Sequence, residues 1–210
     1  MLKRLLFAMG MVCMTFSYAW SSPCTDPKAC SVVSSGASLQ ASIVPSSPNT
    51  TGTAGSTPPQ GEFSTWVYSN DTNNSFGGLT FVYQFNLTGN DYRDISVDGY
   101  AGYTQGFNAK ASSSSCVTSG SDPCSSPAAS ISAGIADFFF SGTAITSPTL
   151  TDFLVVDTNS QVFSPNVAGI LDGVTASAPT YAPVPEPSSM LLFGTGLSGF
   201  AAMLRRRAKK

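Results

Sequence analysis

The sequence TFVYQFNL, from Thr80 to Leu87, decides the fold of this 210-residue chain. Large apolar side chains occupy every second position of the stretch, at Phe81, Tyr83, Phe85 and Leu87. Such alternation is typical of a β-strand with one buried face, because successive side chains of a strand point to opposite sides. We therefore predict a strand over residues 80–87 with one face in the core.

Similar short stretches lie on both sides of this strand. Phe63 to Tyr68 precedes it, and the Gly-Asn-Asp cluster at 89–91 predicts a hairpin turn to a strand within residues 94–103. Outside the terminal segments, no apolar repeat of helical period persists for three turns. The pattern predicts an all-β domain over residues 20–173, a single antiparallel β-sandwich or jelly-roll-like ectodomain. Further strands are expected at residues 131–141, 149–157 and 161–163, with a weak edge strand at 39–44.

Three segments between these strands are rich in turn-forming residues. Residues 45–61 combine Ser, Thr, Pro and Gly, and we expect a flexible loop there. Ser112 to Pro127 is expected to be a polar loop. Residues 174–184 contain Pro179 and Pro183 and predict a stiff stalk that lifts the domain off a membrane.

The N-terminus has the three parts of a secretory signal peptide. Lys3 and Arg4 are followed by an apolar segment, residues 5–16, and then by Ser17-Tyr18-Ala19, with small residues at positions −3 and −1. We predict cleavage after Ala19, so that residues 1–19 are removed and the mature chain reaches an oxidising compartment.

Four cysteines remain after this cleavage: Cys24, Cys30, Cys116 and Cys124. Four cysteines allow three pairings, and an exported chain favours disulfides. We favour Cys24 with Cys30 and Cys116 with Cys124, because each pair closes a short loop rich in Pro, Asp or Ser. A metal site of four thiolates is the alternative, but these spacings are wider than those of zinc sites.

The C-terminus predicts a single membrane span. Residues 188–204 carry no charge, and a helix of that length reaches about 25 Å, near the lower limit for crossing a bilayer. A basic tail, residues 205–210, follows the span at once. Positive charges next to a span stay in the cytoplasm, so the ectodomain is expected outside. The residues that set this topology are Arg205, Arg206, Arg207, Lys209 and Lys210.

Pro185, Glu186 and Pro187 precede the span and favour an extended, accessible backbone. Together with the Gly-containing apolar run and the basic end, this tail resembles the PEP-CTERM sorting signal of Gram-negative bacteria, over residues 185–210. The resemblance implies an exosortase that recognises the three residues and removes the tail from a chain held in the inner membrane. It also implies a final place at the cell surface or in an exopolysaccharide or biofilm matrix. A plain tail anchor and a GPI signal are the alternatives, but GPI signals end in apolar residues.

Composition argues against several functional classes. Residues 20–184 contain three basic and eleven acidic residues, a net charge of −8, which disfavours nucleic acid and anionic lipid as partners. The chain contains no histidine, which excludes Ser-His and Cys-His nucleophilic pairs. Glu62, Asp137 and Asp152 are the candidate carboxylates for a glycosidase, but nothing in the sequence marks them as a pair. We therefore predict a protein that is not an enzyme and needs no cofactor.

Two weaker patterns suggest binding. Asp91, Asp94 and Asp98 have the oxygen ligands that calcium prefers, although turns around a hairpin explain the same residues. Four aromatic residues, Trp66, Tyr68, Tyr100 and Tyr103, suit a stacking platform for sugars, although such residues usually belong to a core. The alternative function is thus a carbohydrate-binding surface module, with or without calcium.

Overall fold

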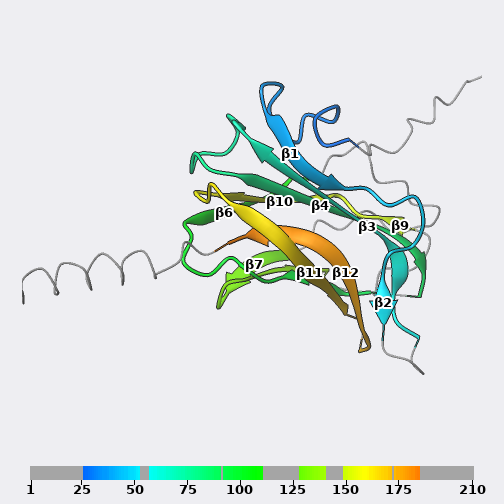
Figure 1. Cartoon of the computed structure of the whole chain (residues 1–210). Helices are drawn as coiled ribbons and strands as arrows, with labels where there is room; N and C mark the ends of the chain where they lie inside the picture. The colour runs from blue at the N-terminus through cyan, green and yellow to red at the C-terminus, as the bar shows by residue number, and fades with distance from the viewer. Residues whose placement is uncertain are drawn as a thin grey trace, which may run out of the picture.

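The computed structural model describes residues 26–52, 57–90, 92–110, 128–140, 149–171 and 173–184, and these form two antiparallel β-sheets packed face to face (Figure 1). Sheet A has the order β1-β3-β4-β10-β6, with β9 beside β4, and sheet B has the order β2-β12-β11-β5-β8-β7. The prediction of an all-β antiparallel fold is confirmed. The strands of sheet A are β1 (Ser38–Ile43), β3 (Gln60–Ser69), β4 (Thr80–Gly89), β6 (Gln105–Lys110), β9 (Thr149–Leu150) and β10 (Phe153–Thr158). Those of sheet B are β2 (Thr51–Gly52), β5 (Asp94–Val97), β7 (Ala128–Ser132), β8 (Ile135–Phe139), β11 (Phe163–Leu171) and β12 (Thr175–Pro183).

The main core lies between the two sheets. Strand β4 supplies its four alternating apolar side chains to this core, all fully buried, as the sequence predicts. Sheet B contributes large side chains too, such as Ile95 and Phe138, and its strand β12 contributes the small residues Ala176, Ala178 and Ala182. The small residues of β12 thus leave room in the core for large side chains, as close packing requires.

The face of β4 that the alternation predicts as core is confirmed as core, and the opposite face is buried as well. Val82 packs there in a second cluster with Trp66, Tyr68, Phe153 and Val155. Val32, Val33 and Ala37 of the N-terminal segment cover this cluster. Asp71 holds the segment in place, since its Oδ1 accepts a hydrogen bond from the Ser34 amide at 2.9 Å.

Strands β4 and β5 do not form the predicted hairpin. β4 pairs with β3 along one edge and with β10 and β9 along the other, so both of its edges are occupied. The chain therefore crosses to sheet B, where β5 pairs with β11 and β8. A hairpin, by contrast, is present within the segment predicted as one strand over 131–141. Strands β7 and β8 meet at Ala133 and Gly134, whose φ values of 52° and 83° suit a two-residue hairpin turn.

The predicted stalk, residues 174–184, is instead strand β12. It pairs with β11 over nine residue pairs, from Leu171 opposite Thr175 to Phe163 opposite Pro183. The prolines that suggested a stalk lie beyond the two residues of β12 that pair with β2. Among the described strands that part of the edge has no partner, so a missing N–H can face it without loss of a ladder bond.

The segment predicted as a flexible loop, residues 45–61, contributes strand residues and hydrogen bonds to the sandwich. It contains β2 and the start of β3. The Asn49 side chain accepts a hydrogen bond from the Phe63 amide at 2.8 Å and donates one to the Phe63 carbonyl at 3.0 Å. The predicted signal peptide, the Ser112 to Pro127 loop and the tail from residue 185 lie outside the described residues. In the described part of the chain, no helix is long and apolar enough to cross a membrane.

Candidate functional site

The end of β12 is the part of the described structure that adjoins the predicted sorting signal. Ala182 is 1% exposed and Pro183 is buried. The Val184 amide then donates a hydrogen bond to the Val162 carbonyl at 3.3 Å. The hydrogen bonds of this strand therefore extend to Val184, the residue before Pro185. Pro185, Glu186 and Pro187 and the five basic topology residues lie outside the described residues, so their roles stay predictions.

Buried polar contacts fasten β12 to sheet A. Thr180 Oγ1 lies 2.8 Å from Thr65 Oγ1 across the core. The Tyr83 hydroxyl donates to the Tyr181 carbonyl at 2.9 Å and bonds to the Tyr100 hydroxyl. Burial raises the pKa of both phenols, so both stay protonated and can donate. The strand that leads to the sorting signal is thus linked to the opposite sheet by side chains as well as by packing.

The three candidate carboxylates do not converge. Glu62 lies between the buried residues Gly61 and Phe63, on the outer face of sheet A, and its Oε2 accepts a hydrogen bond from Asn86 at 3.0 Å. Asp137 lies on the outer face of sheet B, between the buried Ala136 and Phe138. Sheets pack about 10 Å apart, so these two carboxylates cannot flank one bond.

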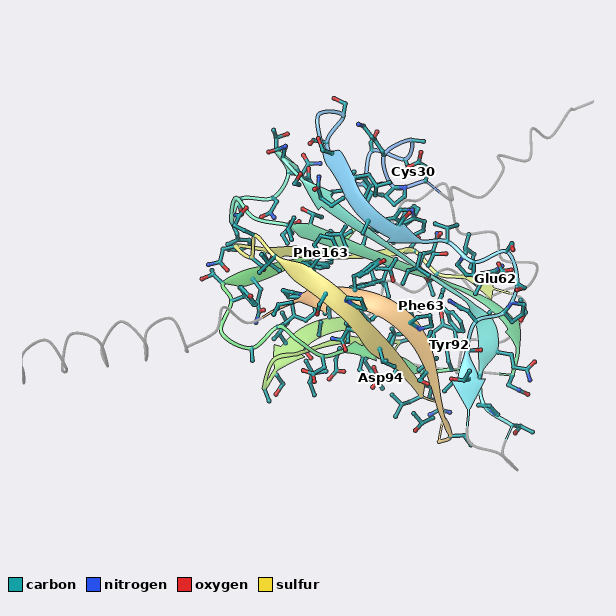
Figure 2. The ribbon with its side chains drawn as sticks, in the orientation of Figure 1. Cys30, Glu62, Phe63, Tyr92, Asp94 and Phe163 are labelled. Atoms are coloured by element: carbon teal, nitrogen blue, oxygen red, sulfur yellow. The ribbon has the colours of Figure 1, made fainter. Side chains whose placement is uncertain are left out.

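Asp152 is the third candidate, and it lies on the inner side of sheet A. It is 4% exposed, and the Oδ1 atom is buried without a hydrogen-bond partner in the described part of the chain. Burial raises the pKa of Asp152 to about 6. The nearby Tyr92 hydroxyl is also buried and unpartnered there, and burial followed by the charge of Asp152 raises the pKa of Tyr92. Figure 2 shows Phe63 and Tyr92 between the sheets and Glu62 and Asp94 apart from each other.

Two of the three predicted calcium ligands, Asp94 and Asp98, lie in the described part of the chain. Asp91 lies outside the described residues, and Asp98 accepts a hydrogen bond from the Gly99 amide at 2.6 Å, a local turn contact. The pKa of Asp94 is raised by burial and then by the charge of Asp137, a neighbour on the outer face of sheet B. Within the described ranges, no three acidic or cysteine residues gather closely enough to hold a metal ion.

The predicted sugar platform belongs to the core. Trp66 and Tyr68 are 5% and 3% exposed beneath the N-terminal segment, and Tyr100 is fully buried between the sheets. Tyr103 is half-buried with an enclosed hydroxyl. Three of the four aromatic residues, Trp66, Tyr68 and Tyr100, therefore belong to the core, as such residues usually do.

Cys30 is a disulfide-bonded cysteine that packs against the second cluster. The other three, Cys24, Cys116 and Cys124, lie outside the described residues. The pairing of Cys24 with Cys30, and that of Cys116 with Cys124, therefore stay predictions.

The described residues define a β-domain of two packed sheets whose last strand, β12, leads into the C-terminal tail. Residues 183–207 match the family model of the PEP-CTERM protein-sorting motif, so the tail carries this motif, as the Pro-Glu-Pro sequence predicts. The motif implies export and an exosortase as processing partner. No curated protein and no solved structure matches the chain. The role of the β-domain must therefore be argued from its own residues.

Proposed function

We propose that this protein is a non-enzymatic bacterial envelope protein that an exosortase releases from the inner membrane. The observation that carries the proposal is the sorting motif at residues 183–207, which begins at the last residue of strand β12. A signal peptide over residues 1–19 and a span over 188–204 place the β-domain outside and the basic tail in the cytoplasm. After processing, the β-domain joins the cell surface or the extracellular matrix.

The separation of the carboxylates supports a role without catalysis. Glu62 and Asp137 occupy opposite outer faces, and Asp152 is enclosed beside Tyr92. The carbohydrate-binding alternative requires an exposed aromatic platform, but three of the four aromatic residues proposed for it are buried. Association with exopolysaccharide therefore rests on the sorting motif. It is tested by whether the mature protein copurifies with the exopolysaccharide fraction of its host.

The processing step is tested by replacing the recognition residues. Pro185→Ala, Glu186→Ala and Pro187→Ala together should leave the full-length chain in the inner membrane of the host, measured by intact mass in each cell fraction. The matched control, Ser188→Ala with Ser189→Ala, changes the adjacent residues and should be processed normally. Normal processing of the triple variant would remove the proposal.

A further inference from the structure

Strand β12 leaves almost no free chain between the folded domain and the sorting motif. Its inward residues alternate down its length and are all buried: Ala176, Ala178, Thr180 and Ala182 are 1%, 2%, 0% and 1% exposed. Its pairing with β11 continues to Pro183, and Val184 is bonded to Val162. The recognition residues begin at the next position.

The last residues of β12 are also packed tightly against Gly99 of a neighbouring loop. Gly99 has a φ of 107°, and a Cβ at this position would lie 3.0 Å from Ala182 Cβ and 3.1 Å from the Pro183 carbonyl oxygen. The backbone of residue 99 thus lies directly against the end of the strand. Proteolytic enzymes act on exposed, extended backbone. Because residues 175–184 are paired and packed, their backbone is not accessible to such an enzyme.

Loops surround the point where β12 ends. Figure 1 shows that β12 runs toward the same end of the sandwich as the starts of β6 and β11. The loops there comprise residues 70–79, 98–104 and 159–162. Their charged residues are Asp71, which is buried, and Asp98, which is exposed. Val162, whose carbonyl accepts the hydrogen bond from the Val184 amide, is 49% exposed. These three loops therefore carry one exposed charge, that of Asp98, beside the start of the motif.

The geometry points to the folded domain itself as the element that limits the access of the exosortase to the sorting motif. While β12 is paired with β11 and packed against sheet A, the exosortase has to come close to the loop end of the sandwich to reach the motif. It then cleaves the chain at a position C-terminal to Val184. The product then keeps β12 and hence the complete sandwich. This inference rests on the proposed function and adds the partner surface and the position of the cut.

A spacer inserted between Ala182 and Pro183 tests the restriction. Gly-Ser-Gly-Ser at this point leaves the matched motif, residues 183–207, unbroken and moves it away from the domain. We expect processing of the full-length chain in its host, followed by pulse-chase, to become about threefold faster or more, because the motif becomes exposed. The control is the same insertion after Gly173, at the opposite end of β12, where a Cβ would meet nothing within 4 Å. It should process at the wild-type rate.

The outcomes separate this inference from the proposed function. If the triple-alanine variant is blocked and the spacer leaves the rate unchanged or slower, the motif is functional and the inference is wrong. A wild-type mature chain whose mass shows an end within residues 175–184 would also overturn it. If the triple-alanine variant is processed normally, both the inference and the proposed function fail.

Discussion

Strands β4 and β12 lie in opposite sheets and contribute to the same core, yet their sequences have little in common. β4 reads TFVYQFNLTG, with aromatic side chains at alternate positions, whereas β12 reads TASAPTYAP. β4 has neighbours on both edges, and β12 is paired along its full length only with β11. The comparison teaches that β4 is a strand by its own pattern and β12 by its surroundings, because small residues there accept the large residues opposite.

The largest expected effect comes from removing one of the large residues of β4. Phe85 is fully buried and lies 5.2 Å from Tyr92 and 6.2 Å from Phe63, measured between ring centroids. Phe85→Ala should lower the free energy of unfolding by about 3–5 kcal/mol, through lost burial and a residual cavity. The measurement is chemical denaturation of the mature protein. The control, Val167→Ala at a site that is 57% exposed, should change it by less than about 0.5 kcal/mol.

An intermediate effect is expected from enlarging a small residue of β12. Ala178 is 2% exposed and faces the core. Ala178→Leu should lower the free energy of unfolding by about 1–3 kcal/mol, because a well-packed core must distort to admit the added atoms. The matched control is Ser177→Leu at the neighbouring outward position, which should have a smaller effect. Equal effects at both positions would show that the buried positions of β12 need not be small.

The smallest effect tests the polar residue enclosed next to β4. Asp152 follows Thr151, whose hydroxyl accepts a hydrogen bond from the Phe85 amide at 2.9 Å. A raised carboxyl pKa means that the folded protein binds more protons than the unfolded one between about pH 4 and about pH 6. The stability contributed by protonated Asp152 is therefore complete below pH 4 and is lost as the pH rises through 6.

Asp152→Asn keeps the size and removes the charge. It should raise the free energy of unfolding at pH 8 by about 1 kcal/mol and have no such effect at pH 4. Thermal unfolding at the two pH values measures the difference between the variant and the wild-type protein. A gain of the same size at both pH values would assign it to packing and not to ionisation.

Local pattern was sufficient where a segment's own side chains carry the information. The alternation of Phe81 to Leu87 identified β4, and the Pro-Glu-Pro sequence identified the sorting motif, because each is read from neighbouring residues. The same reasoning failed for the predicted hairpin at 89–91. Whether two successive strands pair depends on which edges are already occupied, and β9 and β10, from residues 149–158, occupy that edge of β4.

The sequence by itself determined an all-β domain and a C-terminal sorting motif, since strand alternation and the motif are local properties. The tertiary structure decided that the proline-containing segment before the tail is a strand and not a stalk. It also decided that Trp66 and Tyr68 are covered by the N-terminal segment and that the three candidate carboxylates are apart. These outcomes depend on contacts between residues distant in the chain, where burial against a partner outweighs the local preference of each segment.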